Sequence, residues 1–120
     1  MSERMQFIEH AGRQILVADF TDYTAPQVMS LVNDVVDEVA GHPRDSVLIL
    51  ADFTRAQVDK PVAEHMKKAL VMDRPYVKRA AWVGTESLPK VFLDNFKSFS
   101  QRQISKFSTR REAMDWLVRE

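Results

Sequence analysis

A run of residues near the middle of the chain, at 47–53, is apolar at every position except Asp52 near its end. Continuous rather than alternating hydrophobicity over so short a length is typical of a strand buried on both faces, as in the centre of a parallel sheet. A similar run at 15–21 ends in the letters ADFT, which also occupy 51–54, and a weaker relative lies at 80–85. A helical pattern follows each run, so we predict a repeated strand–helix unit.

The first predicted helix begins at residues 24–27, Thr-Ala-Pro-Gln, which match a capping box with a proline in the first turn. Its apolar residues recur on one face, and Gly41 followed by Pro43 ends it. The second predicted helix begins at 59–61, Asp-Lys-Pro, and ends before Pro75. Each helix is expected to pack its apolar face on the sheet.

Two further apolar segments, at 5–9 and 13–17, flank a short Gly-containing link and predict an antiparallel hairpin. The last third of the chain predicts a wide apolar helix at 87–99, an edge strand at 103–107 and a fourth helix opened by a capping box at 109–112. The element order is therefore β-β-α-β-α-β-α-β-α. Such an α/β chain is expected to form a mostly parallel five-stranded sheet with an N-terminal antiparallel hairpin and four helices.

Length and composition narrow the class of protein. The chain of 120 residues is expected to form one domain, 1–120, and its lack of cysteine excludes disulfides, thiolate catalysis and cysteine-ligated metals. The N-terminal residues contain no apolar h-region, and no apolar run approaches the length of a membrane span. We therefore expect a soluble, cytoplasmic protein.

The net charge of zero conceals an asymmetry between the two halves of the chain. Residues 1–59 contain four basic and ten acidic residues, a net charge of −6, whereas 60–120 contain 13 basic and seven acidic residues, a net charge of +6. One interpretation is a basic face that binds an anionic partner, such as a membrane surface or an acidic protein. The alternative is that the two halves of one domain complement each other, or that the charges scatter over the surface.

Asp19, Asp52 and Thr85 each follow a predicted strand, at the edge of a parallel sheet where ligands tend to bind. Two neighbouring carboxylates could share a proton or hold a divalent cation, as in an enzyme. The alternative, which we favour, is that each aspartate accepts backbone hydrogen bonds in the turn after its strand. No third ligand, metal-binding histidine pair or phosphate-binding glycine loop is evident, so we expect no enzyme activity, cofactor, metal or nucleic-acid partner.

Apolar residues on two of the helices suggest a different kind of site. Val71 and Met72 lie off the inner face of the second helix, and phenylalanines crowd the third. Such residues are usually core, but they could line a groove for an acyl chain or a partner helix beside the basic residues of the same elements. The candidate ligand-binding residues are Met66, Leu70, Val71, Met72, Phe92, Leu93, Phe96 and Phe99.

Three stretches resemble the SpoIIAA-like, or STAS-like, bacterial proteins: 77–84 (VKRAAWVG), 107–117 (FSTRREAMDWL) and 49–53 (ILADF). The likeness extends over about residues 5–118. It implies the superhelical strand–helix sheet shared by anti-sigma-factor antagonists and CRAL-TRIO lipid-transfer domains. It also implies a non-catalytic module that binds protein partners, nucleotides or lipids.

The chain departs from the anti-sigma-factor antagonists at the start of the helix after the central strand, where they carry a phosphorylated serine. Residues 58–61 here are Val-Asp-Lys-Pro, and Thr54 is the only hydroxyl between the strand and that helix. A phosphate there would add about two negative charges at a helix N-terminus. The usual phosphoswitch is therefore not expected, and a turn or cap role is expected for Thr54.

Two functions remain open. The first is a regulatory protein–protein interaction through the loop and helix after the central strand. The second is a carrier or sensor of an apolar ligand, a lipid or fatty acid, with peripheral membrane association. A homodimer is also predicted if all crossover helices cover one sheet face and leave the other apolar. The candidate partner-binding residues are Asp59, Lys60, Glu64, Lys67 and Lys68.

Overall fold

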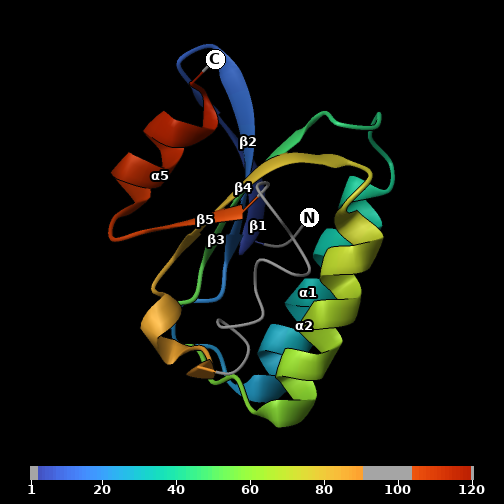
Figure 1. Cartoon of the computed structure of the whole chain (residues 1–120), viewed down its shortest axis with the longest axis vertical. Coiled ribbons are helices and arrows are strands. Elements are labelled where there is room, and N and C mark those ends of the chain that lie inside the picture. The colour runs from blue at the N-terminus through green and yellow to red at the C-terminus, as the bar shows by residue number, and fades with distance from the viewer. Residues whose placement is uncertain (1–2, 91–103, 120) are drawn as a thin grey trace.

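The computed structural model describes residues 3–90 and 104–119 (Figure 1). The strands pair in the order β1-β2-β3-β4-β5, with β1 and β2 antiparallel and all other neighbours parallel. The predicted five-stranded sheet with its antiparallel hairpin is therefore confirmed. The elements are β1 (Met5–His10), β2 (Arg13–Asp19), α1 (Ala25–Val39), β3 (Val47–Asp52), α2 (Lys60–Asp73), β4 (Val77–Val83), the 3-10 helix η1 (Thr85–Ser87), β5 (Ile104–Phe107) and α5 (Arg110–Leu117).

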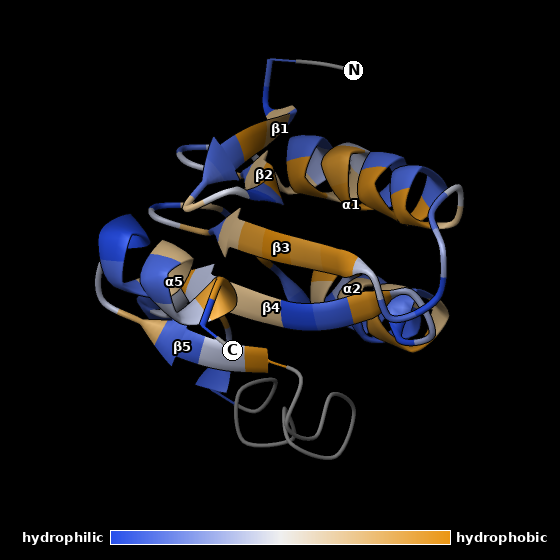
Figure 2. Ribbon diagram, turned by 90° about the horizontal axis from the view of Figure 1, so that it is seen from above, coloured by the Kyte–Doolittle hydropathy of each residue, from blue (hydrophilic) through white to orange (hydrophobic). Residues whose placement is uncertain are grey.

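Strand β3 lies at the centre of the sheet, and all six of its residues are buried. Helices α1 and α2 pack side by side on one face of the sheet, and α5 packs on the other face against β3, β4 and β5 (Figures 1 and 2). Alternate residues of β3 therefore enter two separate cores: Ile49 and Ala51 on the α1/α2 face, and Leu48 and Leu50 on the α5 face. This arrangement explains why the strand is apolar throughout.

Helix α5 covers part of the sheet face opposite α1 and α2. The homodimer was predicted on the condition that every crossover helix covers the same sheet face. The crossover helices in the described residues, α1 and α2, do so, and α5, which follows the last strand and is not a crossover helix, buries Ala113 and Leu117 on the opposite face. The strands beneath α5 therefore offer no bare apolar surface to a second copy.

The described residues contain three α-helices rather than the four that were predicted. Most of the predicted third helix, 87–99, lies outside the described residues. Its predicted start instead belongs to the turn after β4, because Ser87 Oγ donates hydrogen bonds to the carbonyls of Phe53 (2.6 Å) and Gly84 (3.2 Å). The starts of the first two helices are as predicted, and the Asp59 side chain caps α2 by accepting a hydrogen bond from the Val62 N–H at 3.0 Å.

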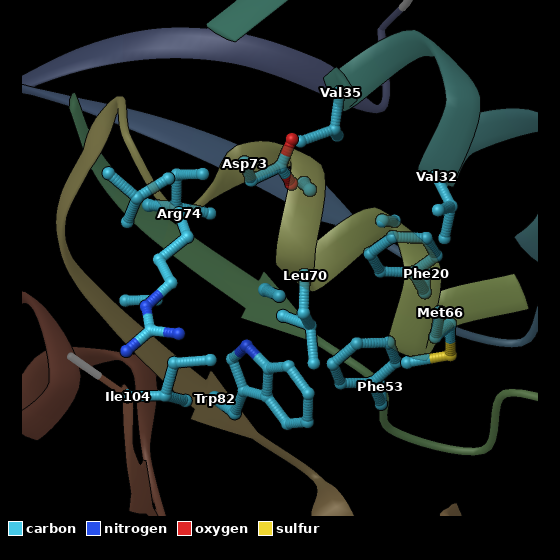
Figure 3. Close-up of a pocket in the computed structure, with 16 residues that line it drawn as sticks. Phe20, Val32, Val35, Phe53, Met66, Leu70, Asp73, Arg74, Trp82 and Ile104 are labelled. Carbon is cyan, nitrogen blue, oxygen red and sulfur yellow. The ribbon is translucent and has the colours of Figure 1, made fainter. Parts of the chain in front are cut away.

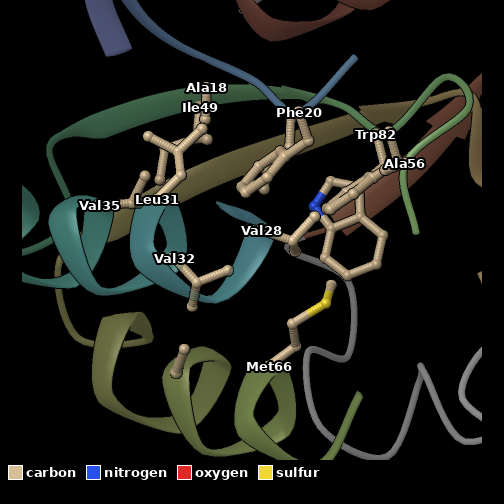
Figure 4. Packing of buried hydrophobic residues seen from close by; sticks show 14 of the residues in the cluster. Ala18, Phe20, Val28, Leu31, Val32, Val35, Ile49, Ala56, Met66 and Trp82 are labelled. Carbon is tan, nitrogen blue, oxygen red and sulfur yellow. The ribbon is translucent and has the colours of Figure 1, made fainter. Parts of the chain in front are cut away.

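Aromatic residues at the ends of neighbouring strands form the centre of the α1/α2 core. The rings of Phe20 and Phe53 stack with centroids 4.7 Å apart, and Phe53 meets Trp82 edge-on at 5.1 Å. Figure 4 shows Met66 reaching from α2 toward Trp82. Since these side chains come from three parallel strands and one helix, their contacts hold the helical layer on the sheet.

Candidate functional site

Asp19 and Asp52 are register partners at the carboxyl ends of β2 and β3. The Thr21 N–H donates to Asp19 Oδ1 at 3.0 Å, and the Thr54 N–H donates to Asp52 Oδ1, also at 3.0 Å. Thr54 Oγ1 donates to the same Asp52 oxygen at 2.6 Å. Each aspartate therefore accepts the backbone hydrogen bond of the turn after its strand, and Thr54 has the turn role predicted for it.

Arg110, the first residue of α5, connects the two aspartates. Its Nε donates to Asp52 Oδ2 at 2.7 Å, and its Nη2 lies 3.2 Å from Asp19 Oδ1. Burial raises the pKa of Asp52, but the hydrogen bonds from Thr54 and Arg110 outweigh it and hold the pKa below its ordinary value. The guanidinium of Arg110 thus occupies the position between the two carboxylates that a shared metal cation would need.

Sequence reasoning missed Arg110, which is separated from Asp52 by 58 positions. Its only local signal is its place directly after Thr109, whose Oγ1 accepts the Glu112 N–H at 3.2 Å as the predicted helix cap. The contact joins the acidic first half of the chain to the basic second half. At this point the two halves complement each other, as one interpretation of the charge asymmetry expected.

An apolar pocket of about 80 Å³ lies between the sheet and α2, on the face that α1 and α2 cover (Figure 3). One water molecule needs roughly 10–15 Å³. The described residues therefore leave space for several water molecules, or for part of a small organic molecule. Besides Trp82, the strand residues that line it are Ala18, Ile49, Ala51, Val77, Ala80 and Ile104.

One side of the pocket is an aromatic wall formed by Phe20, Phe53 and Trp82. Met66 and Leu70 approach this wall from α2 (Figure 3). Flat rings and a flexible thioether suit apolar ligands of varied shape. The structure therefore brings two of the predicted ligand-binding residues, Met66 and Leu70, together in one pocket.

Asp73 and Arg74, at the end of α2, are the charged residues among the described lining residues. Asp73 Oδ1 is buried, and no group in the described part of the chain donates a hydrogen bond to it. Burial raises the pKa of Asp73 to about 7. Leaving a buried acceptor unpaired costs about 1–3 kcal/mol. Asp73 is therefore a polar feature of the pocket that packing alone does not explain, and sequence reasoning did not find it.

The other predicted ligand-binding residues are not brought to this pocket. Val71 and Met72 are 58% and 60% exposed, on the outer side of α2. Each helical residue is rotated by about 100° from the one before it, so both point away from the side that Leu70 presents. The remaining four candidates, Phe92, Leu93, Phe96 and Phe99, lie outside the described residues.

The residues predicted to bind a partner lie along the first part of α2. Asp59 is the helix cap, and Lys67 Nζ donates to Glu64 Oε1 at 3.3 Å. Lys60, Glu64 and Lys68 are exposed. Because they recur at every fourth position, they form one outward stripe that continues toward Val71 and Met72.

A second, polar hollow of about 380 Å³ lies beside the carboxyl ends of β4 and β5. Thr85, one of the residues predicted at this edge of the sheet, is among its lining residues, together with Glu86, Lys106 and Glu112. These three charged side chains are exposed and solvated. The apolar pocket, lined mostly by buried apolar side chains, is the better-formed candidate site.

The comparisons with known proteins bear on the fold. Neither a protein-family model nor a curated protein matches the sequence. Within residues 3–90 and 104–119, no helix is both long enough and apolar enough to cross a bilayer. An uncharacterized protein of the DUF3478 family from Shewanella loihica PV-4, solved at 2.25 Å and described as having a SpoIIAA-like fold, superposes with a TM-score of 0.71 and 18% sequence identity. The match covers 94% of this chain and 91% of that one, so the chain has the SpoIIAA-like fold that its sequence resembles.

Proposed function

We propose that this chain is a non-enzymatic binding module that holds a small apolar ligand in the apolar pocket. The observation behind the proposal is the pocket itself, in which the aromatic wall, Met66 and Leu70 surround a space of about 80 Å³. Small-molecule sites are usually concave and apolar with a few polar groups, and this pocket has that composition. Of the two functions left open by the sequence, the geometry favours the carrier or sensor of an apolar ligand.

The non-enzymatic part of the proposal is supported by the state of the strand-end carboxylates. Asp19 and Asp52 accept turn hydrogen bonds and pair with Arg110. A general base needs a carboxylate that can take a proton from a substrate, and the pKa of Asp52 is held below its ordinary value. Asp52 is therefore poorly suited to act as a general base.

Titration with benzyl alcohol, followed by calorimetry and thermal unfolding, tests the proposal. The Leu70→Trp variant places an indole in the pocket and is expected to weaken binding about tenfold or more. The matched control is Val71→Ala, at the next and exposed position of the helix, which is expected to bind as the wild type does. If benzyl alcohol does not bind saturably, or if Leu70→Trp binds it as tightly as the wild type does, the proposal is wrong.

A regulatory protein–protein contact through the outer side of α2 is a second candidate. Val71 and Met72 are the large hydrophobic residues most exposed to solvent in the described part of the chain, and they continue the charged stripe of Lys60, Glu64 and Lys68. An apolar centre beside charged residues is common in protein interfaces. Sedimentation of the wild type and of Val71→Asp tests the case in which the partner is a second copy. A dimer that the substitution dissociates supports it, and a monomer at high concentration excludes it.

A further inference from the structure

We propose that the ligand of the apolar pocket is a small primary amine, bound with its ammonium group against Asp73 and its apolar body against the aromatic wall. The inference rests on the proposed function, to which it adds the chemistry of the polar end of the ligand. It follows from the surroundings of Asp73 and from its place on α2.

Asp73 Oδ1 is enclosed by protein, yet it accepts no hydrogen bond from residues 3–90 or 104–119. Buried polar atoms in folded proteins are nearly always paired, so a carboxyl oxygen left unpaired by the described residues, in a pocket wall, is a place where a ligand could supply a donor. Among the described pocket-lining residues, Figure 3 shows the apolar side chain of Val35 on α1 beside the Asp73 carboxyl. A ligand with a donor group at this end of the pocket would complete the hydrogen bonding.

The position of Asp73 on its helix favours a positively charged donor over a neutral one. Asp73 is the last residue of α2. The unpaired carbonyl groups at a helix C-terminus create a partial negative charge, which repels a carboxylate and attracts a cation. An ammonium group would therefore be stabilised by Asp73 and by the helix end together. It also donates up to three charge-assisted hydrogen bonds, stronger than those of a hydroxyl.

The same two features disfavour a carboxylate headgroup such as that of a fatty acid, because it would lie beside Asp73 and the negative helix end. Arg74 is the lining residue that would attract such a headgroup. In Figure 3, however, its guanidinium lies near Ile104 and Trp82, away from the carboxyl of Asp73. An amine and a carboxylate would thus bind at different ends of the pocket, which makes them separable by experiment.

Calorimetric titration with three probes that share one apolar body, benzylamine, benzyl alcohol and benzoate, tests the inference. Benzylamine is expected to bind the wild type with a Kd about tenfold lower than that of either other probe. Asp73→Asn, which is nearly isosteric, is expected to remove most of this preference and to change the Kd of benzyl alcohol by no more than about twofold. The matched control, Glu64→Gln, removes an exposed negative charge from the same helix without altering the pocket, and it should keep the preference for the amine.

The outcomes separate this inference from the proposed function. If benzyl alcohol binds and Leu70→Trp abolishes its binding, but benzylamine binds no better, the amine inference is wrong and the proposed function stands. If none of the three probes binds saturably, both are wrong. A crystal grown with benzylamine that shows only water against Asp73 also overturns the inference. Should Asp73→Asn fail to fold, the ranking of the three probes on the wild type decides the question.

Discussion

Asp73 is a carboxyl group whose ionised form the fold disfavours. Burial raises its pKa to about 7, whereas it ionises near about pH 4 in the unfolded chain. Between those two values the folded state holds the extra proton, so stability is greatest below the unfolded pKa and falls as the pH rises to the folded pKa. The full shift corresponds to about 4 kcal/mol, which partial solvent exposure reduces to roughly 2 kcal/mol.

The Asp73→Asn variant isolates this effect. Relative to the variant, the wild type is expected to lose roughly 2 kcal/mol of unfolding free energy between about pH 4 and pH 8. Urea denaturation at a series of pH values measures the difference. If the difference in unfolding free energy between the two proteins does not change with pH, the Asp73 carboxyl ionises in the folded protein as it does in the unfolded chain.

Arg110 pairs with two neighbouring carboxylates, so its removal takes a cation from Asp52 and leaves Asp19 with Arg4, which lies 3.6 Å from it. Arg110 is partly exposed, and we expect Arg110→Met to lose about 2 kcal/mol of stability at neutral pH. The pKa of Asp52 is depressed in the fold, so its stabilising contribution is present above its unfolded pKa and is lost as the pH falls through its folded value. When the pH is lowered from neutral to acid, the Arg110→Met variant is therefore expected to lose less unfolding free energy than the wild type does. Denaturation curves of Arg110→Met that match those of the wild type at neutral pH and in acid would disprove this role.

Gly84 lies in the left-handed region, with φ of +69°, and packs against Thr54. A Cβ atom at Gly84 would lie 2.4 Å from Thr54 Oγ1 and 2.5 Å from Thr54 N, so Gly84→Ala must displace the turn after β3. Gly12 has a φ of +80° and nothing within 4 Å of a built Cβ, so Gly12→Ala reports the backbone strain alone. We expect losses of about 1 kcal/mol for Gly12→Ala and roughly 3 kcal/mol for Gly84→Ala, measured by chemical denaturation. Equal losses would mean that the contact with Thr54 is unimportant.

At the scale of the element, α2 has two sides with different environments. Met66 on its inner side is buried, whereas Met72 on its outer side is 60% exposed. Met66→Ala is expected to reduce the free energy of unfolding by about 3 kcal/mol, and Met72→Ala to change it by less than about 0.5 kcal/mol. Denaturant titration of the two variants compares one substitution on the two sides of one helix. A large loss for Met72→Ala would indicate that the outer side is covered in solution, as a dimer would require.

Elements governed by local signals are the ones that the sequence predicts well. The hairpin turn at Ala11 and Gly12 has positive φ at both residues, as a tight turn between twisted strands requires. The cap at Asp59 and the continuous apolar run of β3 likewise depend on residues close together in the chain. For these elements, residue type and spacing are enough to specify the conformation.

The candidate site depends on contacts between distant elements, and the sequence predicts it only in part. Met66 and Leu70 fall on the inner side of a helix whose periodicity is visible, so they could be named. Asp73 looks like an ordinary polar residue near a helix end, because its burial depends on how α1 and α2 lie over the sheet. The bridge from Arg110 to Asp52 depends on α5 crossing to the other sheet face, which no local pattern records.

At the scale of the whole molecule, the sheet separates two hydrophobic cores, and the apolar pocket lies in the one on the α1/α2 side. On one side, α5 buries Ala113 and Leu117, and its first residue, Arg110, ties the carboxyl ends of β2 and β3 together. On the other side, α1 and α2 enclose a core that leaves the apolar pocket. We therefore expect ligand binding to alter the α1/α2 side and to leave the α5 side nearly unchanged.

Two-dimensional NMR during titration with benzyl alcohol tests directly whether the apolar pocket is the binding site. Saturable changes in chemical shift are expected at Phe53, Met66 and Trp82, with little change at Ala113 on the opposite side of the sheet. Changes confined to the α5 side or to the outer side of α2, or no saturable change at any residue, would contradict the assignment of ligand binding to this pocket.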